Sequence, residues 1–465
     1  MLEPIVRNNL HRLHSMYDRF PSPARNLLTS ARGLLLARIR YSGAALNALQ
    51  RLRDHERWSA DEINCYQLTR LREIIEHARA TTPHYRNYPR LRLRSTDDLR
   101  ALPILSREVV RRDPAQFFSD STPPRERIHA GTTGTTGANL TVAYDEQALA
   151  ENWAFLLRQW GWAGVPPRTP RLTLFGARVV PANHNSPPFW TYNVAERQLL
   201  LSIFHLSTRT APDYLDCLSR HAGKVLEGFP SVLAILADFA ERRGKTIPMR
   251  AIFTSGEPLY PDAHARIERV FRSRIFDTYG MTELCGLIQE CEAGEMHLAP
   301  EYGYLEILND RGEPVAPGEE GHFVWTGFLN TAMPLVRYRV GDRGKWWTGA
   351  PCACGRAFPR IVPTITRESD VLRAPDGRLF SPRALNQLLK QTTALRFCQF
   401  VHDRQDRVVV RGVASGALGS EEVMKVRARL QKLLGSSANV TAELSDAPIS
   451  RQGGKIPLIV DQAPR

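Results

Sequence analysis

The chain has no long hydrophobic run. No stretch approaches the ~18 uncharged apolar residues that a membrane-spanning helix needs, and the first residues lack the apolar core of a secretory signal peptide. The 465 residues contain only seven cysteines, an odd number spread along the chain, which is not the pattern of a disulfide framework and fits a reducing compartment. We therefore expect a cytoplasmic protein that is long enough for two or three domains.

Lysine is also scarce. Only seven of the 62 basic residues are lysines, the rest being arginines, and the formal net charge is +14. This scarcity makes each lysine informative. An excess of basic over acidic residues suits the binding of phosphorylated substrates or of an anionic surface. No nucleic-acid-binding pattern accompanies it, so we expect no nucleic-acid partner.

A glycine- and threonine-rich stretch runs from Ala130 to Gly137 and reads AGTTGTTG. Its glycines let successive backbone N–H groups turn toward one anion, and its threonines add hydroxyl donors. Residues 140–144 (LTVAY) have the composition of a strand, so the loop is expected to lie between two strands. A kinase-type phosphate loop needs a lysine that this stretch lacks. The sequence predicts a phosphate-binding loop, with a flexible hairpin turn as the alternative.

Beyond this loop, strand and helix patterns alternate. Short apolar runs at 172–175, 198–202 and 251–254 predict buried strands, and longer amphipathic patterns at 232–242 and 264–272 predict helices. Such alternation is typical of an α/β fold with a parallel sheet.

Polar residues follow several predicted strands, at the sheet edge where α/β proteins bind ligands. Ser255-Gly-Glu257 follows the strand at 251–254, and Thr282-Glu283 follows another; a carboxylate beside a hydroxyl suits Mg²⁺ and phosphate. Residues 334–342 predict a strand closed by a Gly-Asp turn. Asp342 there is placed to bind the two hydroxyls of a ribose, although a turn-capping aspartate is equally common.

Six motifs follow one another along the chain: Thr132–Gly137, Ser255–Pro258, Tyr279–Glu283, Tyr338–Asp342, Thr366–Arg367 and Gly454–Lys455. In this order they resemble the adenylate-forming (acyl-CoA synthetase) enzymes. The closer resemblance is to the phenylacetate-CoA ligase branch and, within it, to members associated with capsular polysaccharide biosynthesis. It extends from about residue 60 to the C-terminus.

The resemblance implies an α/β fold with a large multi-sheet N-terminal adenylation domain and a small mobile α+β C-terminal domain. We expect a basic helical extension at residues 1–60, an AMP-binding domain at 61–368 and a lid domain at 371–465. The implied activity is ATP-dependent activation of a small-molecule carboxylate through an acyl-adenylate, with pyrophosphate release and then thioester formation with CoA.

The resemblance also implies a role for each motif. Thr282 would contact the α-phosphate, Glu283 would hold Mg²⁺, and Lys455 would stabilise the transition state as a compact charge. The residues implied for the β- and γ-phosphates are Thr132, Thr133, Gly134, Thr135, Thr136 and Gly137. Those implied for the adenine are Ser255, Gly256, Glu257 and Tyr279, with Gly280 beside them. The ribose would be bound by Asp342 and Arg367.

Two departures from the family pattern keep other functions open. Ala138-Asn139 stands where a Lys-Pro is common, so one phosphate contact is missing, and Ser369 replaces an acid at the hinge of the mobile domain. The alternatives are an adenylyl or acyl transferase acting on a sugar, an amine or a carrier protein, and a catalytically weakened nucleotide-binding scaffold.

Four residues predict a zinc site. Cys291, His297, Cys352 and Cys354 supply three thiolates and an imidazole, which suits tetrahedral Zn²⁺, and members of the resembled branch often carry the same pattern. The role would be structural, joining the loop after Glu283 to the loop before Arg367. Buried free thiols beside a surface histidine are the alternative.

The N-terminal segment is strongly basic. Up to Arg53 it holds nine arginines against Glu3 and Asp18, with apolar residues interspersed, which predicts an amphipathic helix. Such a helix either makes peripheral contact with the inner face of a membrane or packs on the main body. The sequence gives no indication of the oligomeric state.

Overall fold

The computed structural model describes most of the chain, namely residues 17, 20–133, 139–177, 179–181, 183–207, 209–257, 259, 261–363, 372–374, 378–380, 384–385, 387–389, 395–403, 407–414, 418–445 and 458–461. Three of the predicted functional segments lie outside the described residues: Gly134–Gly137, the Thr366–Arg367 pair with Ser369, and Lys455. Their assigned roles, like the domain boundaries near residues 60 and 370, remain predictions.

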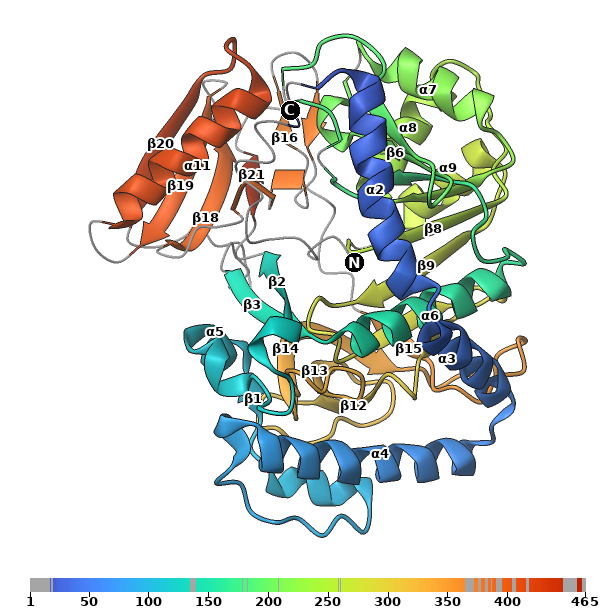
Figure 1. Cartoon of the computed structure of the whole chain (residues 1–465), viewed down its shortest axis with the longest axis vertical. Helices are drawn as coiled ribbons and strands as arrows, with labels where there is room; N and C mark the ends of the chain where they lie inside the picture. The colour runs from blue at the N-terminus through green and yellow to red at the C-terminus, as the bar shows by residue number, and fades with distance from the viewer. Residues whose placement is uncertain are drawn as a thin grey trace.

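The N-terminal part is helical, and Figure 1 shows its helices on the outside of the molecule. They are α2 (Ser22–Arg40), α3 (Gly43–Asp54), the short η1 (His55–Arg57) and α4 (Ala60–Thr81). The Ser42 hydroxyl caps α3 by accepting a hydrogen bond from the Ala45 N–H at 3.1 Å. Ser59 and Glu62 form a reciprocal capping box at the start of α4. The predicted basic helix is therefore two helices, because the Tyr41–Ser42 link and its cap start a new one.

A sheet of eight strands forms the centre of the molecule, and its strands β9, β8, β7, β4 and β6 run parallel. In spatial order the strands are β11 (Met296–Leu298), β10 (Leu287–Glu290), β9 (Ile275–Gly280), β8 (Ala251–Ser255), β7 (Val225–Gly228), β4 (Arg171–Leu174), β6 (Gln198–Leu201) and β5 (Trp190–Asn193). The three predicted strands are confirmed as β4, β6 and β8.

Helices cover both faces of this sheet: α6 (Glu146–Trp162), α7 (Ala211–Arg220), α8 (Pro230–Glu241) and α9 (Pro261–Phe271). Ala251 and Phe253 of β8 belong to the core on the α6 face, whereas Ile252 between them joins the core formed with α7, α8 and α9. This is the period of two expected of a strand that is buried on both faces. The predicted helices at 232–242 and 264–272 are confirmed as α8 and α9, with α9 beginning three residues earlier, at Pro261.

A second sheet and a hairpin complete the large body. The sheet is built from β1 (Leu105–Ser106), β14 (Tyr338–Trp346), β13 (Gly321–Gly327), β12 (Gly303–Leu308) and β15 (Ile361–Pro363), and the hairpin from β2 (Ile128–Thr133) and β3 (Asn139–Tyr144). The chain from α4 to β2 contains the short helices η2 (Pro83–Tyr85), η3 (Thr96–Ala101), α5 (Arg107–Arg112), η4 (Pro114–Phe117) and η5 (Pro124–Glu126), and η6 (Ile203–His205) follows β6 of the central sheet.

The C-terminal part has its own sheet and core. The strand order is β20 (Val440–Ser445), β19 (Val408–Ala414), β18 (Leu395–His402) and β21 (Ile459–Asp461), with α11 (Leu418–Leu434) packed against it. A two-stranded pair, β16 (Leu372–Arg373) and β17 (Leu379–Phe380), and the short η7 (Gln387–Leu389) precede these strands. Figure 1 shows this unit beside the large body, near the end of the hairpin at which β2 ends and β3 begins. Among the described helices, none is both long and apolar enough to cross a bilayer.

Candidate active site

The predicted phosphate loop connects the two strands of a hairpin. β2 and β3 pair antiparallel from Ile128 opposite Tyr144 to Thr133 opposite Asn139, so the loop at 134–138 closes the hairpin. The prediction that it lies between strands, and not at the start of a helix, is confirmed. Thr132 and Thr133 are the last residues of β2, directly before the loop.

The Ser255–Glu257 motif forms the turn after β8. Gly256 has a φ of +82°, and a Cβ placed there would lie 3.3 Å from the ring of Phe229, so the position requires glycine on both counts. Ser255 is in register with Thr278 of β9, which places this turn beside Tyr279 and Gly280. Two predicted adenine-binding motifs therefore lie together at the carboxyl edge of the parallel sheet, where ligands bind in such folds.

Tyr279 connects this edge to the second sheet. Its hydroxyl donates a hydrogen bond of 2.8 Å to Oδ2 of Asp342, in β14. Asp342 does not close a strand as we predicted: β14 begins four residues later than the predicted strand and continues to Trp346. The register between β13 and β14 is irregular at this point, and Gly341, with a φ of +99°, accommodates the bulge that turns Asp342 toward Tyr279. The Asp342 side chain remains exposed.

Glu283, three residues beyond β9, has a buried side chain, with 2% of its surface exposed. Its Oε1 accepts two hydrogen bonds, one from the Arg107 guanidinium at 3.0 Å and one from the Tyr338 hydroxyl at 2.9 Å. Leu284 and Arg337, the neighbours in sequence of Glu283 and Tyr338, have φ values of 54° and 49°. Positive φ is costly for such residues and concentrates at functional sites, so the chain is strained on both sides of this contact.

Thr282 is fixed through its backbone. Its carbonyl oxygen accepts a hydrogen bond from the hydroxyl of Tyr144, the last residue of β3. Tyr144 therefore joins the end of the phosphate-loop hairpin to the Thr282-Glu283 motif. The Thr282 side chain is half-buried, which leaves its hydroxyl at the edge of the site.

Sequence reasoning missed Arg107 and Tyr144 as site residues. Arg107 is one of 55 arginines and follows no recognisable motif, so only the fold, which starts α5 next to Glu283, gives it a role. Tyr144 ends a strand pattern whose apolar residues suggested only core packing. Figure 1 shows the hairpin and β14 close to each other at this place in the molecule.

The four predicted zinc ligands come together. The ligand atoms of Cys291, His297, Cys352 and Cys354 all lie within 4.8 Å of one another. The Sγ atoms of Cys291 and Cys352 are 3.7 Å apart, and the Cys354 Sγ is 3.4 Å from the His297 Nε2. Zinc–sulfur bonds of about 2.3 Å and zinc–nitrogen bonds of about 2.0 Å in a tetrahedron require separations of about 3.8 Å and about 3.5 Å, so this set fits the ion.

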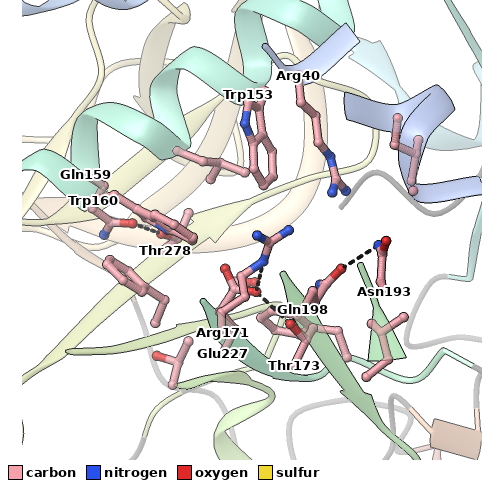
Figure 2. A pocket seen from close by; sticks show the side chains of 18 of the residues that line it. Arg40, Trp153, Gln159, Trp160, Arg171, Thr173, Asn193, Gln198, Glu227 and Thr278 are labelled. Atoms are coloured by element: carbon pink, nitrogen blue, oxygen red, sulfur yellow. Dashed lines mark hydrogen bonds and ion pairs between the residues drawn. The ribbon is translucent and has the colours of Figure 1, made fainter. Parts of the chain in front are cut away.

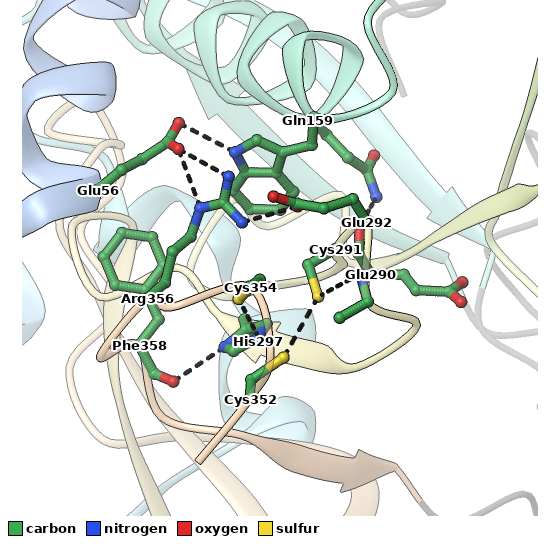
Figure 3. A network of polar contacts seen from close by, with 12 residues as sticks. Glu56, Gln159, Glu290, Cys291, Glu292, His297, Cys352, Cys354, Arg356 and Phe358 are labelled. Carbon is green, nitrogen blue, oxygen red and sulfur yellow. Dashed lines mark hydrogen bonds and ion pairs between the residues drawn. The ribbon is translucent and has the colours of Figure 1, made fainter.

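The surroundings of the cluster fit a structural metal site as well (Figure 3). His297 holds Nδ1 2.9 Å from the Phe358 carbonyl oxygen, which leaves Nε2 to face the thiols. The Ala293 N–H donates to the Cys291 Sγ at 3.3 Å. Burial lowers the pKa of His297, which favours the neutral, metal-binding form. Next to the cluster, Arg356 pairs with Glu292 and with Glu56 from the N-terminal helices.

Comparisons with known proteins agree with this geometry. A family model described as AMP-binding enzyme matches residues 174–332. Protein CapK of Staphylococcus aureus is 22% identical over 458 residues, covering 95% of this chain and 98% of that protein. The phenylacetate-coenzyme A ligase of Escherichia coli strain K12 is 25% identical over 351 residues, covering 71% of this chain and 77% of the ligase.

A solved 2-hydroxyisobutyryl-CoA ligase, in complex with 2-HIB-AMP and CoA, has the same fold. Its TM-score is 0.57 at 21% identity, with 87% of this chain and 91% of the ligase covered. The structure of that ligase in its postadenylation state has a TM-score of 0.53. The family model and the sequence relatives support the predicted resemblance to the AMP-binding, adenylate-forming enzymes and, among them, to the phenylacetate-CoA ligase-like branch near Protein CapK.

Proposed function

We propose that this protein is an AMP-forming ligase that activates a small carboxylic acid with ATP and transfers the acyl group to CoA. In the first step a carboxylate oxygen attacks the α-phosphorus, and the bond from that phosphorus to pyrophosphate breaks. In the second step the CoA thiolate attacks the acyl carbonyl carbon and AMP leaves. No general base is needed for the first step, because the acid is already ionised at neutral pH.

One observation carries this proposal most directly. Glu283 and Asp342, which are 59 positions apart in sequence, each accept a hydrogen bond from a tyrosine of the other's motif: Tyr338 bonds to Glu283 and Tyr279 bonds to Asp342. The two motifs are thereby held face to face across the junction of the two sheets. A nucleotide bound with its adenine beside Tyr279 and its ribose on Asp342 would have its α-phosphate near Thr282.

The chemistry of the first step is mainly electrostatic, since charge on the phosphorus and on the leaving pyrophosphate must be neutralised and held in line. Glu283 would hold Mg²⁺, which supplies that neutralisation when bound. We assign the threonine hydroxyls and backbone N–H groups of residues 132–137 to the outer phosphates. Arg367 would join Asp342 at the ribose, and Lys455 would approach the α-phosphate from the C-terminal part.

The buried position of Glu283 supports its assignment. A lone buried carboxylate is costly, and Arg107 and Tyr338 compensate its charge. Both donors bind Oε1, so the carboxylate is oriented by two rigid elements, α5 and β14. Because the carboxylate is already oriented, its side chain needs little reorganisation when the ion binds.

The proposed zinc role is structural. Cys291 and His297 follow the Glu283 motif, whereas Cys352 and Cys354 follow β14, so a bound Zn²⁺ would clamp the two segments that carry Glu283 and Asp342. The tetrahedral spacing of the ligand atoms supports this assignment. We give the ion no part in the reaction, because all four of its positions are taken by protein atoms.

The experiment that tests the proposed function measures carboxylate-dependent release of pyrophosphate from ATP and Mg²⁺, with and without CoA. Lys455→Ala is compared with Lys432→Ala, a matched loss of a lysine in α11. We expect release that needs a particular acid, that is lost in Lys455→Ala and that is retained in Lys432→Ala. Release without CoA-dependent AMP formation would indicate a transferase with another acceptor. ATP binding without any Lys455-dependent turnover would favour the scaffold alternative.

We also propose that α2 makes the peripheral membrane contact. The helix packs on β5 with its polar side: Asn26 Oδ1 accepts from the Tyr192 N–H at 2.9 Å and Ser30 Oγ accepts from the Val194 N–H at 3.0 Å. The opposite side carries four leucines with 43% to 71% of their surface exposed, namely Leu27, Leu28, Leu34 and Leu35.

Exposed Arg32 and Arg38 flank these leucines, and α2 contains no acidic residue. An apolar face edged by arginines suits an anionic lipid surface. Sedimentation with vesicles of phosphatidylcholine plus phosphatidylglycerol is expected to carry down the protein, and the Leu27→Ser, Leu34→Ser double variant is expected to stay in solution. Equal sedimentation with pure phosphatidylcholine, or equal behaviour of the variant, would contradict this contact.

A further inference from the structure

A cavity of about 130 Å³ lies between the central sheet and the helices α2 and α6 (Figure 2). Ser255 and Thr278 line it, and they immediately precede Gly256 and Tyr279 of the proposed adenine site. A carboxylic acid with its carboxylate at the α-phosphate can therefore extend the rest of its carbon skeleton into this cavity.

The sheet side of the cavity is unusually polar. β4 turns Leu172 and Leu174 toward the apolar core under α7 and α8, but it turns Arg171 and Thr173 into the cavity. The neighbouring strands continue this polar row across the sheet, since Thr173 is in register with Glu227 of β7, and Arg171 with Gln198 of β6. The inner face of a central sheet is normally apolar, so a buried polar row on it indicates a purpose other than packing.

The polar row is connected by hydrogen bonds. Gln198 Nε2 donates to the Thr173 hydroxyl at 2.8 Å, and that hydroxyl donates to Glu227 Oε2 at 2.9 Å. Arg171 donates to Glu196 Oε2 at 2.6 Å and approaches Glu227 at 3.3 Å. Carboxylate, hydroxyl and amide groups are thus held in fixed positions along one wall.

The charges of the cavity region are already balanced. Arg40 of α2 lies 3.4 Å from Glu196, so two guanidinium groups, Arg40 and Arg171, face two carboxylates, Glu196 and Glu227. Arg32 also lines the cavity, at its exposed edge. A ligand group with a full charge would disturb this balance in a poorly hydrated site, whereas a neutral polar group would not.

Some hydrogen-bonding capacity is nevertheless left over on the helix side. The Trp153 side chain is buried, and its Nε1 finds no partner among the described residues; the same holds for Nε of Arg40, which stacks on the Trp153 ring at 4.3 Å. Buried donors are nearly always paired. Figure 2 shows both side chains extending from the helices toward the polar row.

We infer that this cavity selects a small carboxylic acid that carries hydroxyl groups on its skeleton, in preference to an aryl or alkyl acid. Hydroxyl groups can accept from the Trp153 and Arg40 N–H groups, and they add no charge. An apolar tail would leave the Trp153 and Arg40 donors unpaired, at a cost of about 1–3 kcal/mol for each buried group. This inference rests on the proposed carboxylate activation and specifies its substrate.

The size of the cavity limits the substrate further. A cavity of about 150 Å³ holds one benzene molecule, so this cavity accepts roughly five or six non-hydrogen atoms besides the carboxylate. The class is therefore that of short-chain hydroxy acids and small sugar acids.

The test is ATP–pyrophosphate exchange with four acids: glycerate and threonate as hydroxylated acids, butyrate and phenylacetate as apolar ones. We expect kcat/KM to be at least about 100-fold higher for a hydroxylated acid, and Trp153→Phe to raise the KM for that acid by about 5- to 30-fold without affecting the apolar acids. Trp162→Phe is the matched control on the same helix. It loses a hydrogen bond to Glu56, outside the cavity, and the acid preference should not change.

The outcomes separate this inference from the proposed function. Lys455-dependent exchange that prefers phenylacetate or butyrate, in wild type and Trp153→Phe alike, would overturn the inference and leave the ligase intact. If no acid supports exchange, the proposed function fails, and direct calorimetric titration of the hydroxylated acids then decides the inference. Binding that weakens in Trp153→Phe supports a hydroxy-acid site, and absence of binding overturns it.

Discussion

Tyr338 donates a hydrogen bond of 2.9 Å to Oε1 of Glu283, and the bond joins the second sheet to the turn that follows the central sheet. Tyr338 begins β14, whereas Glu283 follows β9 of the central sheet. Arg107, at the start of α5, binds the same oxygen at 3.0 Å. The position of the proposed metal-binding carboxylate is therefore set by three elements that meet only in the folded chain.

Tyr338→Phe should impair the Mg²⁺-dependent step while the protein stays folded. A hydrogen bond to a charged group contributes about 1.5–3 kcal/mol, so we expect kcat/KM for ATP to fall by about 10-fold or more. The Mg²⁺ concentration that gives half-maximal pyrophosphate exchange should rise, because Glu283 loses one of its two orienting donors. Measuring exchange as a function of Mg²⁺ concentration checks both effects.

Tyr302→Phe is the matched control for this variant. Tyr302 is equally buried in the same core, and its hydroxyl donates to Asn152 Oδ1 at 2.9 Å, away from Glu283. It should lose a similar amount of stability without a change in Mg²⁺ dependence. If both variants shifted the Mg²⁺ dependence equally, Tyr338 would have only a structural role.

The purified protein should contain zinc in a one-to-one ratio with the chain, because the Cys291 cluster has the spacing of a tetrahedral site. Cys352→Ser should lose most of the metal and lower the first thermal transition, by about 2–4 °C for each kcal/mol of lost stabilisation. Elemental analysis and calorimetry check these two outcomes.

Cys398→Ser is the control for the zinc prediction. Cys398 is buried, like Cys291 and Cys352, but it lies in β18, in the C-terminal sheet. Its replacement should leave the metal content unchanged. A protein that contains no zinc after expression with added zinc, or a Cys352→Ser variant that retains it, would show that the four residues are merely buried side chains.

The parts of the fold set by local pattern could be predicted from the sequence. The strands around Leu172 and Ile252 are short apolar runs, and the helix at α8 has helical spacing, so their types follow from periodicity alone. The zinc ligands could be named because thiols and an imidazole are rare enough in this chain to be noticed. Their spacing in the folded protein could not be predicted, since Cys291 and Cys352 are 61 residues apart.

Features that depend on pairing between distant segments could not be predicted. The bulge that turns Asp342 out of β14 arises from its register with β13, and the role of Arg107 arises from the docking of α5 beside Glu283. The inward polar side of α2 was equally hidden, because leucines at helical spacing normally face the core. Its partners Tyr192 and Val194 lie more than 160 positions away.

Asp277 should make stability depend on pH. An unfolded aspartate loses its proton near pH 4, whereas burial raises the pKa of Asp277 to about 7, despite the hydrogen bond from the Thr254 hydroxyl. Between these pH values the unfolded state releases a proton that the folded state keeps. The Asp277 carboxyl group therefore lowers the free energy of unfolding progressively as the pH rises toward 7, and the loss is complete above pH 7. Glu290 strengthens the effect and His264 opposes it.

Asp277→Asn removes this titration but keeps an oxygen that accepts from Thr254. Relative to wild type, the variant should gain roughly 4 kcal/mol in the free energy of unfolding between about pH 4 and about pH 8, as measured from the first urea transition. If the difference between the two proteins were the same at both pH values, Asp277 would titrate normally in the folded state.

The buried pair Arg158–Glu301 should be the most sensitive contact between α6 and the second sheet. Arg158 Nη1 lies 2.7 Å from Glu301 Oε1, and both side chains are almost fully buried. Glu301→Gln leaves the guanidinium uncompensated in an aromatic surround, so we expect a loss of about 3–5 kcal/mol in the free energy of unfolding. Glu241→Gln, which breaks the exposed pair with Arg269, should have little effect.

Adding Arg158→Met to Glu301→Gln should recover much of the loss, because the cost arises from the unpaired charge and not from the missing bond. Urea unfolding of the four proteins decides the point: a double variant no more stable than Glu301→Gln alone would show that the pair stabilises the fold by its own attraction.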